Sequence, residues 1–460
     1  MSQVIFSTMR IFLFFAMFCA AAGTLFFLLS APPRALEIPE MQNEAQLPLS
    51  AVSGTVSNTI PASVPSSTHI TSSSAEKIGK DIAYQAPLPN PPTIVKGIYA
   101  TGWSAGSTKK MKSLIDLIDR TELNSIVIDI KDYSGFVSYR TGIPEVAAAG
   151  AEKEIRIAAP NALLKQLHEK GIYVIGRVSV FQDPILARAH PEWALKDQMT
   201  GEPWEDRKGL AWMDPAEKSV WAYNVAIARD AFARGFDEIN FDYVRFASDG
   251  DLSRITYPTW DGIAPKHVIV RTFFEYVRAE LKGQKISADL FGLATVNPDD
   301  LGIGQVIEDG YANFDFVSPM IYPSHYASGF LGYKNPASVP YEVIQYSLEI
   351  ALTRIRGEPI LPQATSSATT TLQSASGTLA VATSSTKAFY SKLRPWLQDF
   401  NLGATYTAEM VRKQIDATEH VLSGERGEDF FAGWLLWNPS NVYTVGALRQ
   451  ESSTSSSTTP

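Results

Sequence analysis

Short apolar runs alternate with segments of helical periodicity between Thr93 and about Leu448. The short runs are bounded by Gly, Asp, Asn and Pro, which is typical of buried parallel strands. They predict eight strands: Val95–Trp103, Ser125–Lys131, Tyr173–Val180, Glu238–Phe246, Lys285–Leu290, Phe316–Tyr322, Leu393–Gln398 and Gly433–Trp437.

The segments between these strands predict helices. Apolar residues from Met111 to Ile118 follow the i, i+3, i+4, i+7 spacing of one helical stripe. Gly171 is a natural stop for a helix over Asn161–Lys170, and Asp214-Pro215 predicts the start of a helix that ends at Arg234. The remaining helices are predicted at Pro265–Lys282, Asp299–Asp309, Tyr341–Arg356 and Thr407–Leu422.

Eight strands, each followed by a helix or a long loop over about 350 residues, favour an α/β fold of the (β/α)8 TIM-barrel class. A doubly wound open sheet is the alternative. That fold usually binds phosphate at a Gly-rich turn after its first strand, and the sequence TGWSAGS from Thr101 lacks the required glycine spacing. We therefore predict the barrel.

Residues 1–30 contain an uncharged apolar run from Ile11 to Leu29, preceded by Arg10. The run is close to the length that spans a bilayer and longer than a typical signal-peptide core. Pro32 directly after Ala31 disfavours cleavage, so we expect a signal anchor or transmembrane helix, with a cleaved signal peptide as the alternative. The rest of the chain is then expected to be extracytoplasmic, anchored to the cell membrane by this single helix, or secreted.

Three segments rich in Ser, Thr, Pro or Ala flank or interrupt the periodic region. They contain few large apolar residues, so they cannot bury enough surface to fold. We interpret residues 31–92 as a disordered linker and 449–460 as a disordered tail. The domain between them spans 93–448, and residues 364–386 form a low-complexity insertion in one of its surface loops.

The net charge of −8 and the lack of a basic stripe argue against nucleic-acid binding. This balance fits a domain that handles neutral or weakly charged substrates. The single cysteine, Cys19, lies in the apolar N-terminal run, so the predicted extracytoplasmic part has no disulfides.

The stretch EINFDYVRF, residues 238–246, places charged residues inside an apolar strand. Asn240 and Asp242 lie two positions apart and therefore share one face of that strand. A buried carboxylate is costly unless it is paired or has a chemical role. Asp242 is therefore either held in place by Arg245 or another buried arginine, or it is functional.

Aspartates also occur near the ends of other predicted strands, where a TIM barrel carries its chemistry. Asp289 lies in SADLFG and Asp399 in PWLQDF. Cleavage of a glycosidic bond needs one carboxylic acid and one carboxylate, and negative charge stabilises its oxocarbenium-like transition state. We predict Asp242 as the nucleophile or base, Asp289 as the acid and Asp399 in reserve, although Asp399 also fits a loop cap.

Aromatic rings and polar side chains near the same strand ends suit sugar binding, because rings stack on sugars and polar groups bind hydroxyls. The substrate-binding candidates are Trp103, Asp129, Lys131, Arg177, Trp212, Arg245, Tyr322, Gln398, Trp437 and Asn438. Structural roles stay open for several of them. Asp129 with Lys131 fits an internal ion pair, and Arg177 fits a partner of a neighbouring carboxylate. Trp103 and Trp437 also fit barrel packing.

Other chemistries have little support in the sequence. Of the six histidines, only His325 lies at a predicted strand end, so we predict no histidine metal site and no cofactor. An all-carboxylate metal site stays open. The chain contains no G-x-S-x-G nucleophile motif.

Eight motifs lie in one order along the folded part: VIDIKDYSG, GRVSVFQDP, WMDP, GFDEINFDYVRF, SADLFG, PMIYPSHY, PWLQDF and GWLLWNPSN. Over about Pro92 to Leu448 the chain resembles the bacterial "putative glycosyl hydrolase domain" family, domain of unknown function 4015. The resemblance implies a TIM-barrel glycoside-hydrolase-like fold, often behind a signal or anchor. It matches Asp242 and Asp289 to the family's aspartates on strands four and five. The Ser/Thr-rich insertion before strand seven departs from the family pattern near Asp399.

We therefore expect a glycoside hydrolase that cleaves a polysaccharide or oligosaccharide of the cell envelope or its surroundings. Two alternatives stay open: a non-catalytic carbohydrate-binding barrel, and an envelope scaffold that spaces other partners. The expected partners are the glycan and, through the N-terminal helix, the membrane, without nucleic acid.

Overall fold

The computed structural model describes residues 81–359 and 389–450. The predicted anchor at 1–30, the linker up to residue 80, the insertion at 364–386 and the end of the tail lie outside the described residues. Within 81–359 and 389–450, no helix is long and apolar enough to cross a bilayer.

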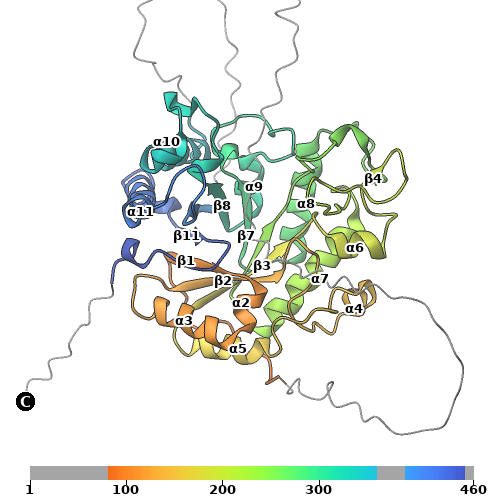
Figure 1. Ribbon diagram of the computed structural model, residues 1–460, viewed down its shortest axis with the longest axis horizontal. Coiled ribbons are helices and arrows are strands. Elements are labelled where there is room, and N and C mark those ends of the chain that lie inside the picture. The colour runs from red at the N-terminus through yellow and green to blue at the C-terminus, as the bar shows by residue number, and fades with distance from the viewer. Residues whose placement is uncertain (1–80, 360–388, 451–460) are drawn as a thin grey trace, which may run out of the picture. The chain divides into compact units, whose positions relative to one another are not determined.

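Eight parallel strands form a closed barrel, which confirms the predicted (β/α)8 class over the open sheet (Figure 1). They are β1 (Val95–Ala100), β2 (Ser125–Lys131), β3 (Tyr173–Ser179), β5 (Glu238–Asp242), β7 (Ile286–Phe291), β8 (Phe316–Ile321), β10 (Trp396–Gln398) and β11 (Gly433–Trp437). Each strand pairs with the next in this order, and β11 pairs with β1 to close the ring. A short strand, β9 (Lys392–Leu393), precedes β10 and also pairs with β8.

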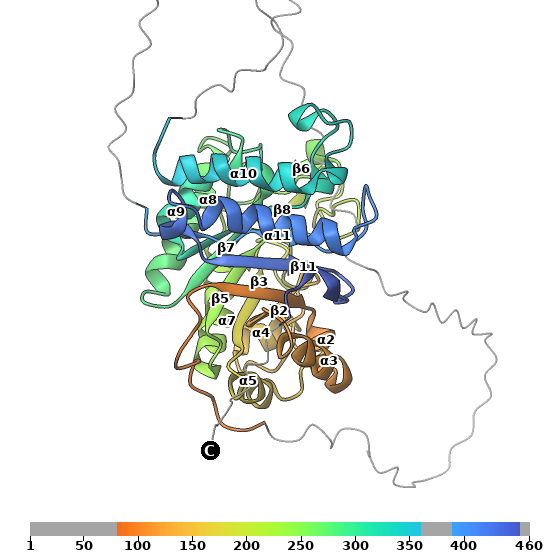
Figure 2. The same cartoon turned by 90° about the vertical axis from the view of Figure 1, so that its left-hand side faces the viewer.

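Helices connect the strands and cover the outside of the barrel (Figures 1 and 2). They are α2 (Gly102–Gly106), α3 (Thr108–Ile118), α4 (Pro144–Ala149), α5 (Pro160–His168), α6 (Pro184–Ala189), α7 (Lys218–Arg234), α8 (Lys266–Glu280), α9 (Ile307–Asn313), α10 (Pro340–Ile355) and α11 (Ala408–Leu422). The predicted stripe from Met111 to Ile118 is the buried face of α3. Figure 2 shows α10 and α11 side by side. Two long loops pair through the short antiparallel strands β4 (Lys196–Asp197) and β6 (Ile255–Thr256).

The predicted start of α7 is wrong. Asp214 does not cap this helix: its Oδ1 accepts a hydrogen bond from the backbone N–H of Ala216 in a turn before the helix, and its Oδ2 accepts from those of Thr259 and Trp260 in a distant loop. The helix begins instead at Lys218, with Glu217 as its cap.

The predicted helix over Asp299–Asp309 is placed too early in the chain, because α9 spans Ile307–Asn313. Leu301 and Gly302 have positive φ values of 56° and 68°, which a right-handed helix does not contain. The first part of this segment is therefore a turn, and α9 begins only at Ile307.

Two strands end earlier than predicted. β1 ends at Ala100, and Trp103 lies in α2, which is capped by the Thr101 hydroxyl. β5 ends at Asp242, because Tyr243 has a φ of 53°, in the left-handed region. Asp242 therefore occupies the last position of its strand, where the chain turns away from the barrel wall.

Residues 81–92, which were predicted to belong to the disordered linker, form hydrogen bonds to the barrel. The Asp81 carboxylate accepts hydrogen bonds from the backbone N–H groups of Asn161 and Ala162. These groups lie in the first turn of α5, whose own cap position is an alanine without a side-chain acceptor. Farther along, the backbone N–H of Leu88 donates to Asp237 at 2.6 Å.

Buried polar side chains at the N-terminal ends of the strands form a hydrogen-bonded network inside the barrel. Glu238 of β5 and Arg394, which lies between β9 and β10, form an ion pair with both side chains fully buried. Ser287 of β7 and Tyr173 of β3 donate hydrogen bonds to Glu238. Asn240, one level higher on β5, donates to Ser287 at 3.0 Å. These hydrogen bonds form a network that begins at Glu238 and continues through Ser287 to Asn240, which also donates to Asp289.

Candidate active site

The buried guanidinium of Arg177, on β3, joins carboxylates from three other strands. Its Nη1 donates to Asp129 Oδ1 on β2 at 2.7 Å. Its Nη2 and Nε donate to Asp242 Oδ2 on β5 at 2.6 and 3.2 Å, and Nε also lies 3.8 Å from Asp289 Oδ2 on β7. The register of the strands brings Arg177 close to these carboxylates, because its Cα partners are Asp129 on β2 and Asn240 on β5. Asp129, Arg177, Asp242 and Asp289 together form the carboxylate cluster.

The two predicted catalytic aspartates have different surroundings. The Asp242 side chain is 7% exposed, and its carboxylate accepts hydrogen bonds from Arg177 and from the backbone N–H of Tyr243. The Asp289 side chain is only 1% exposed. Its Oδ1 accepts hydrogen bonds from Asn240 Nδ2 and Trp396 Nε1, both at 2.8 Å. The guanidinium therefore stabilises negative charge on Asp242, while Asp289 is less exposed to solvent.

Burial raises the pKa of Asp289 well above its ordinary range, and the negative charge of Asp242 raises it further. Arg177 and the hydrogen bonds from Asn240 and Trp396 act in the opposite direction, with smaller effect. Burial likewise raises the pKa of Asp129, against the opposing charge of Arg177. Burial disfavours the charged form of a carboxyl group. Within the cluster, burial therefore favours the protonated form of Asp289, while Asp242 accepts two hydrogen bonds from the Arg177 guanidinium.

Aromatic rings form a wall beside the cluster. Trp437, at the end of β11, stacks on Tyr99 of β1 with ring centroids 3.9 Å apart, and meets Trp396 edge-on at 5.5 Å. The Arg177 guanidinium lies 5.0 Å from the Trp437 ring, and the Tyr99 hydroxyl donates to Asp129 at 2.5 Å. Trp437 is partly exposed, so one part of its ring is open to a bound molecule.

Tyr322, directly after β8, also reaches the cluster. Burial raises the pKa of its hydroxyl, and the negative charges of Asp289 and Asp242 raise it further. Its ring packs edge-on against His325 at 5.2 Å and Phe400 at 5.7 Å. Tyr322 therefore adds a neutral hydroxyl to the surroundings of the two carboxyl groups.

Residues 97–368 and 362–443 match the family described as "Putative glycosyl hydrolase domain". The match covers the barrel and all four residues of the carboxylate cluster. The chain belongs to this family. No curated protein sequence matches the chain.

Several solved structures are similar to this chain. A hypothetical protein from Ruminiclostridium thermocellum ATCC 27405 is 38% identical, with 45% of this chain and 98% of that chain covered and a TM-score of 0.38. The glycoside hydrolase domain of PgaB (BpsB) from Bordetella bronchiseptica is 12% identical, with 76% and 94% covered and a TM-score of 0.47. TtGalA, an alpha-galactosidase from Thermus thermophilus, is 13% identical, with 78% and 60% covered and a TM-score of 0.41. The family assignment rests on the matched residues and not on these structures.

Lys131 does not join the carboxylate cluster of the glycosyl hydrolase domain. It is fully buried and pairs with Asp183, also fully buried, at 2.7 Å. The pairing of β2 with β3 shifts register between Asp129 and Lys131, which separates the two side chains. The ion pair expected between Asp129 and Lys131 is therefore absent, and Asp129 pairs with Arg177 instead.

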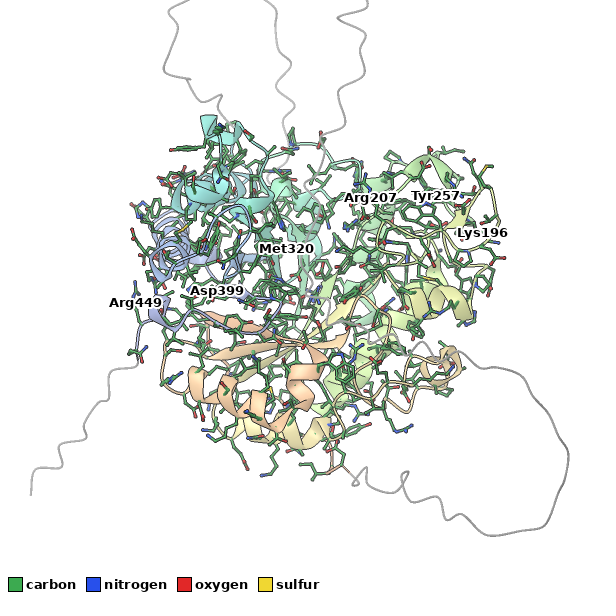
Figure 3. The ribbon with its side chains drawn as sticks, viewed as in Figure 1. Lys196, Arg207, Tyr257, Met320, Asp399 and Arg449 are labelled. Atoms are coloured by element: carbon green, nitrogen blue, oxygen red, sulfur yellow. The ribbon has the colours of Figure 1, made fainter. Side chains whose placement is uncertain are left out.

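Gln398, Asn438 and Asp399 stabilise the loops after β10 and β11. Gln398 is fully buried and donates to a backbone carbonyl of the following loop at 3.0 Å, while Asn438 donates to the carbonyl of Asp399. The Asp399 carboxylate accepts hydrogen bonds from the Thr444 backbone N–H at 2.8 Å and hydroxyl at 2.6 Å. Figure 3 labels Asp399 beside β11, apart from Met320 on β8. Asp399 is therefore a loop cap, which was its alternative assignment.

Arg245 and Trp212 form a second group next to the cluster. The Arg245 guanidinium lies 4.7 Å from the ring of Trp212 and 4.9 Å from that of Phe291, at the end of β7. Trp212 is fully buried, so it supports Arg245 and offers no free ring face to a sugar. Arg245 does not hold Asp242, because Arg177 fills that role.

Trp103 lies outside the cluster, on α2. Its side chain is 53% exposed, and the guanidinium of Arg156 lies 5.3 Å from its ring. Arg156 is itself paired with Asp132 and Glu154. Trp103 is therefore an exposed ring on a neighbouring helix. The prediction that placed it at the end of the first strand is wrong.

Tyr99, Asn240 and Trp396 belong to the site but were not among the predicted site residues. Asn240 shares a strand face with Asp242, so the two-residue strand period could have included it. Tyr99 and Trp396 lie in apolar strands that resemble ordinary barrel packing. Only the three-dimensional arrangement shows that the Tyr99 hydroxyl and the Trp396 N–H bind carboxylates.

Within 81–359 and 389–450, no group of three or more His, Cys, Asp or Glu side chains is arranged to hold a metal ion. The three aspartates of the cluster face the guanidinium of Arg177, which supplies the positive charge between them.

Proposed function

We propose that this protein is a glycoside hydrolase in which Asp242 is the nucleophile or base and Asp289 is the acid. The family match supports hydrolysis of glycosidic bonds in general. The pair of residues is supported by its position, since the carboxyl ends of barrel strands carry the chemistry of this fold.

The observation that carries the proposal is the contrast between the two carboxyl groups. Arg177 stabilises the charge of Asp242, which is slightly exposed, whereas burial and the neighbouring charge raise the pKa of Asp289. Environments that push two carboxyl groups toward opposite protonation states provide the acid and the base or nucleophile of glycoside hydrolysis.

The position of the pair favours a retaining mechanism. Asp242 and Asp289 lie on neighbouring strands, and an oxygen of each approaches the same Arg177 Nε atom. The distance between these two oxygens therefore cannot exceed the sum of their distances to Nε, 3.2 and 3.8 Å. Retaining enzymes place the two groups roughly 5–5.5 Å apart, so that one carboxylate attacks the anomeric carbon directly.

A screen of oligosaccharides with product analysis tests the activity. We expect the wild-type protein to release shorter sugars whose new reducing ends keep the anomeric configuration of the substrate, as followed by proton NMR. Inverted products would contradict the retaining mechanism. Tight glycan binding without any product would contradict the enzyme assignment.

One observation favours a second function, that of a non-catalytic carbohydrate-binding barrel. All three aspartates of the carboxylate cluster bind or face Arg177, as residues with a purely structural role would. Under this alternative the partly exposed Trp437 binds the sugar, and replacement of Asp242 by Asn leaves the affinity unchanged. The same replacement abolishes product formation if the protein is an enzyme.

We also propose that the barrel is extracytoplasmic and tethered by its N-terminal apolar run. The support is the uncharged sequence from Ile11 to Leu29 with Arg10 before it. Protease added to intact cells is expected to degrade the barrel. Full protection in intact cells, with degradation only after lysis, would contradict this location.

A further inference from the structure

Arg245 is a buried cation without a carboxylate partner. The residue is 5% exposed. Its Nη1 donates to the carbonyl of Phe246 at 3.1 Å and to the Ser248 hydroxyl at 2.9 Å. In the part of the chain that the structure describes, no acidic group lies within ion-pair distance of Arg245, although every other buried arginine there has one. Burial lowers the pKa of Arg245, which shows how little water compensates its charge.

Three aromatic rings fix the plane of this guanidinium. Its centre lies 4.7 Å from the ring of Trp212, 4.9 Å from that of Phe291 and 5.6 Å from that of Tyr243. Tyr243 directly follows Asp242, and Phe291 lies two residues after Asp289. The rings therefore hold Arg245 beside both predicted catalytic residues. A guanidinium held in one plane loses little entropy when it binds a planar anion.

Asp206, Asp242 and Asp249 act electrostatically on Arg245, but none of these three carboxylates lies within ion-pair distance of it. The Asp206 carboxylate accepts hydrogen bonds from Trp212 Nε1 at 3.0 Å and Gln182 Nε2 at 2.8 Å. Burial raises the pKa of Asp249, and the charge of Asp206 raises it further, which weakens the negative charge of Asp249.

Two exposed cations add positive charge on the same side. Arg207 and Lys208 follow Asp206 in the loop between β4 and α7, and both act electrostatically on Asp249. Figure 3 labels Arg207 on this loop. Arg207 and Lys208 therefore oppose the negative charge of Asp249, which acts on Arg245.

We propose that Arg245 is a specificity-determining residue that binds the carboxylate of an acidic sugar, next to the bond that Asp242 and Asp289 cleave. The substrate class is then a glycan that contains uronic acid or another carboxylate-bearing sugar. This inference rests on the proposed function for the position of the cleaved bond. A planar carboxylate matches the fork of a guanidinium, and such charge-assisted hydrogen bonds are stronger than neutral ones.

Equilibrium binding tests the subsite separately from catalysis. Isothermal titration would compare glucuronate- and galacturonate-containing oligosaccharides with the same oligosaccharides after reduction of their carboxyl groups to alcohols. Sulfated neutral oligosaccharides form a third set, which distinguishes a carboxylate site from a general anion site. We expect the wild-type protein to bind at least one carboxylate-bearing oligosaccharide about tenfold more tightly than its reduced counterpart. Equal affinities throughout, no binding of any acidic oligosaccharide, or a stronger preference for sulfate would each overturn the proposal.

Substitutions then assign the preference to Arg245. Arg245→Met is expected to abolish it, and Arg245→Lys to retain part of it, because lysine keeps the charge but not the planar fork. Arg156→Met is the matched control: Arg156 also lies against an aromatic ring, but its charge is already paired with Asp132 and Glu154. A full preference in folded Arg245→Met would overturn the assignment.

Two further outcomes separate this inference from the proposed function. If Arg245→Met does not fold, two other measurements test the assignment to Arg245. Arg245→Lys is expected to lose part of the carboxylate preference, and wild-type binding is expected to weaken as the salt concentration rises, because salt screens a carboxylate–arginine contact. A carboxylate preference without hydrolysis would support the subsite and contradict only the enzyme assignment. Hydrolysis of neutral glycans without any carboxylate preference would contradict the subsite and support the enzyme.

Discussion

Individual aspartates in this barrel differ in what surrounds them, and this decides their roles. Asp289 and Asp399 are both buried at strand ends, and burial raises the pKa of each. Asp289 also lies near the charge of Asp242, whereas the Asp399 carboxylate accepts hydrogen bonds from the Thr444 backbone N–H and hydroxyl. The sequence shows the same residue type in the same setting, so only the neighbours separate an acid candidate from a loop cap.

Asp399 gives a prediction of pH dependence. Burial raises its pKa to about 6 from an ordinary 3.8, so the folded protein binds a proton that the unfolded chain has already lost. The stability that this proton contributes is full below about pH 4 and is lost as the pH rises through 6. From pH 4 to 7, the free energy of unfolding of wild type is expected to fall by up to about 3 kcal/mol relative to Asp399→Asn.

Urea unfolding of both proteins across this pH range measures the effect. The two proteins also differ in their free energy of unfolding by an amount that does not depend on pH, because the substitution alters the bonds to Thr444. The test uses only the part of the difference that changes with pH. Parallel stability curves would contradict the burial of Asp399. Because Asp399 does not contact the carboxylate cluster, the variant is expected to keep full activity where it is folded.

At the scale of elements, strand β11 begins at a glycine that no other residue can replace without strain. Gly433 has a φ of 108°, and a Cβ atom there would lie 1.8 Å from the carbonyl oxygen of Val95 on β1. We expect Gly433→Ala to lower the free energy of unfolding by several kcal/mol, roughly 3 or more, because strand pairing must shift.

Gly171→Ala is the matched control for this substitution. Gly171, after α5, also has a positive φ, of 71°, but a Cβ atom there would meet no atom within 4 Å. Only the cost of placing alanine in the left-handed backbone conformation applies, so the free energy of unfolding is expected to fall by about 1 kcal/mol. Equal losses in the two variants, measured by denaturant unfolding, would contradict the close approach of β1 and β11.

The sequence predicts elements better than their ends. Apolar runs identify all the barrel strands because a strand buried on both faces must be apolar along its length. Trp103 and Tyr243 were placed on strands because nothing in the local pattern shows that Thr101 caps a short helix or that Tyr243 is left-handed. The partner of Asp242 could not be predicted either, since the register between β3 and β5 brings Arg177 to it and leaves Arg245 aside.

At the scale of the whole molecule, the chain that precedes the barrel contributes to its stability. Asp81 satisfies two backbone N–H groups at the start of α5, and Leu88 binds Asp237. A chain that begins at Thr93 lacks these bonds. Its free energy of unfolding is expected to be about 2 kcal/mol or more below that of a chain that begins at Gly79.

Asp81→Ala in the longer chain isolates the capping contribution and is expected to cost about 1 kcal/mol. Equal unfolding midpoints for the chains that begin at Gly79 and Thr93 would show that residues 81–92 do not stabilise the barrel.

Closure of the barrel brings together residues that are distant in sequence, and the proposed chemistry depends on this closure. Asp129, Arg177, Asp242 and Asp289 come from four successive strands, and the rings beside them come from strands at the two ends of the chain. No short motif contains the site, and the family match covers most of the barrel.

The most direct test is a double-mutant cycle on Asp242 and Asp289, measured as kcat/KM on a cleaved oligosaccharide, with folding checked by circular dichroism. If the two groups act as one unit, Asp242→Asn and Asp289→Asn each lower kcat/KM by about a thousandfold, and the double variant is little worse than either. Full activity in either folded single variant would contradict the assignment of that residue, and full activity in both would contradict the proposed site.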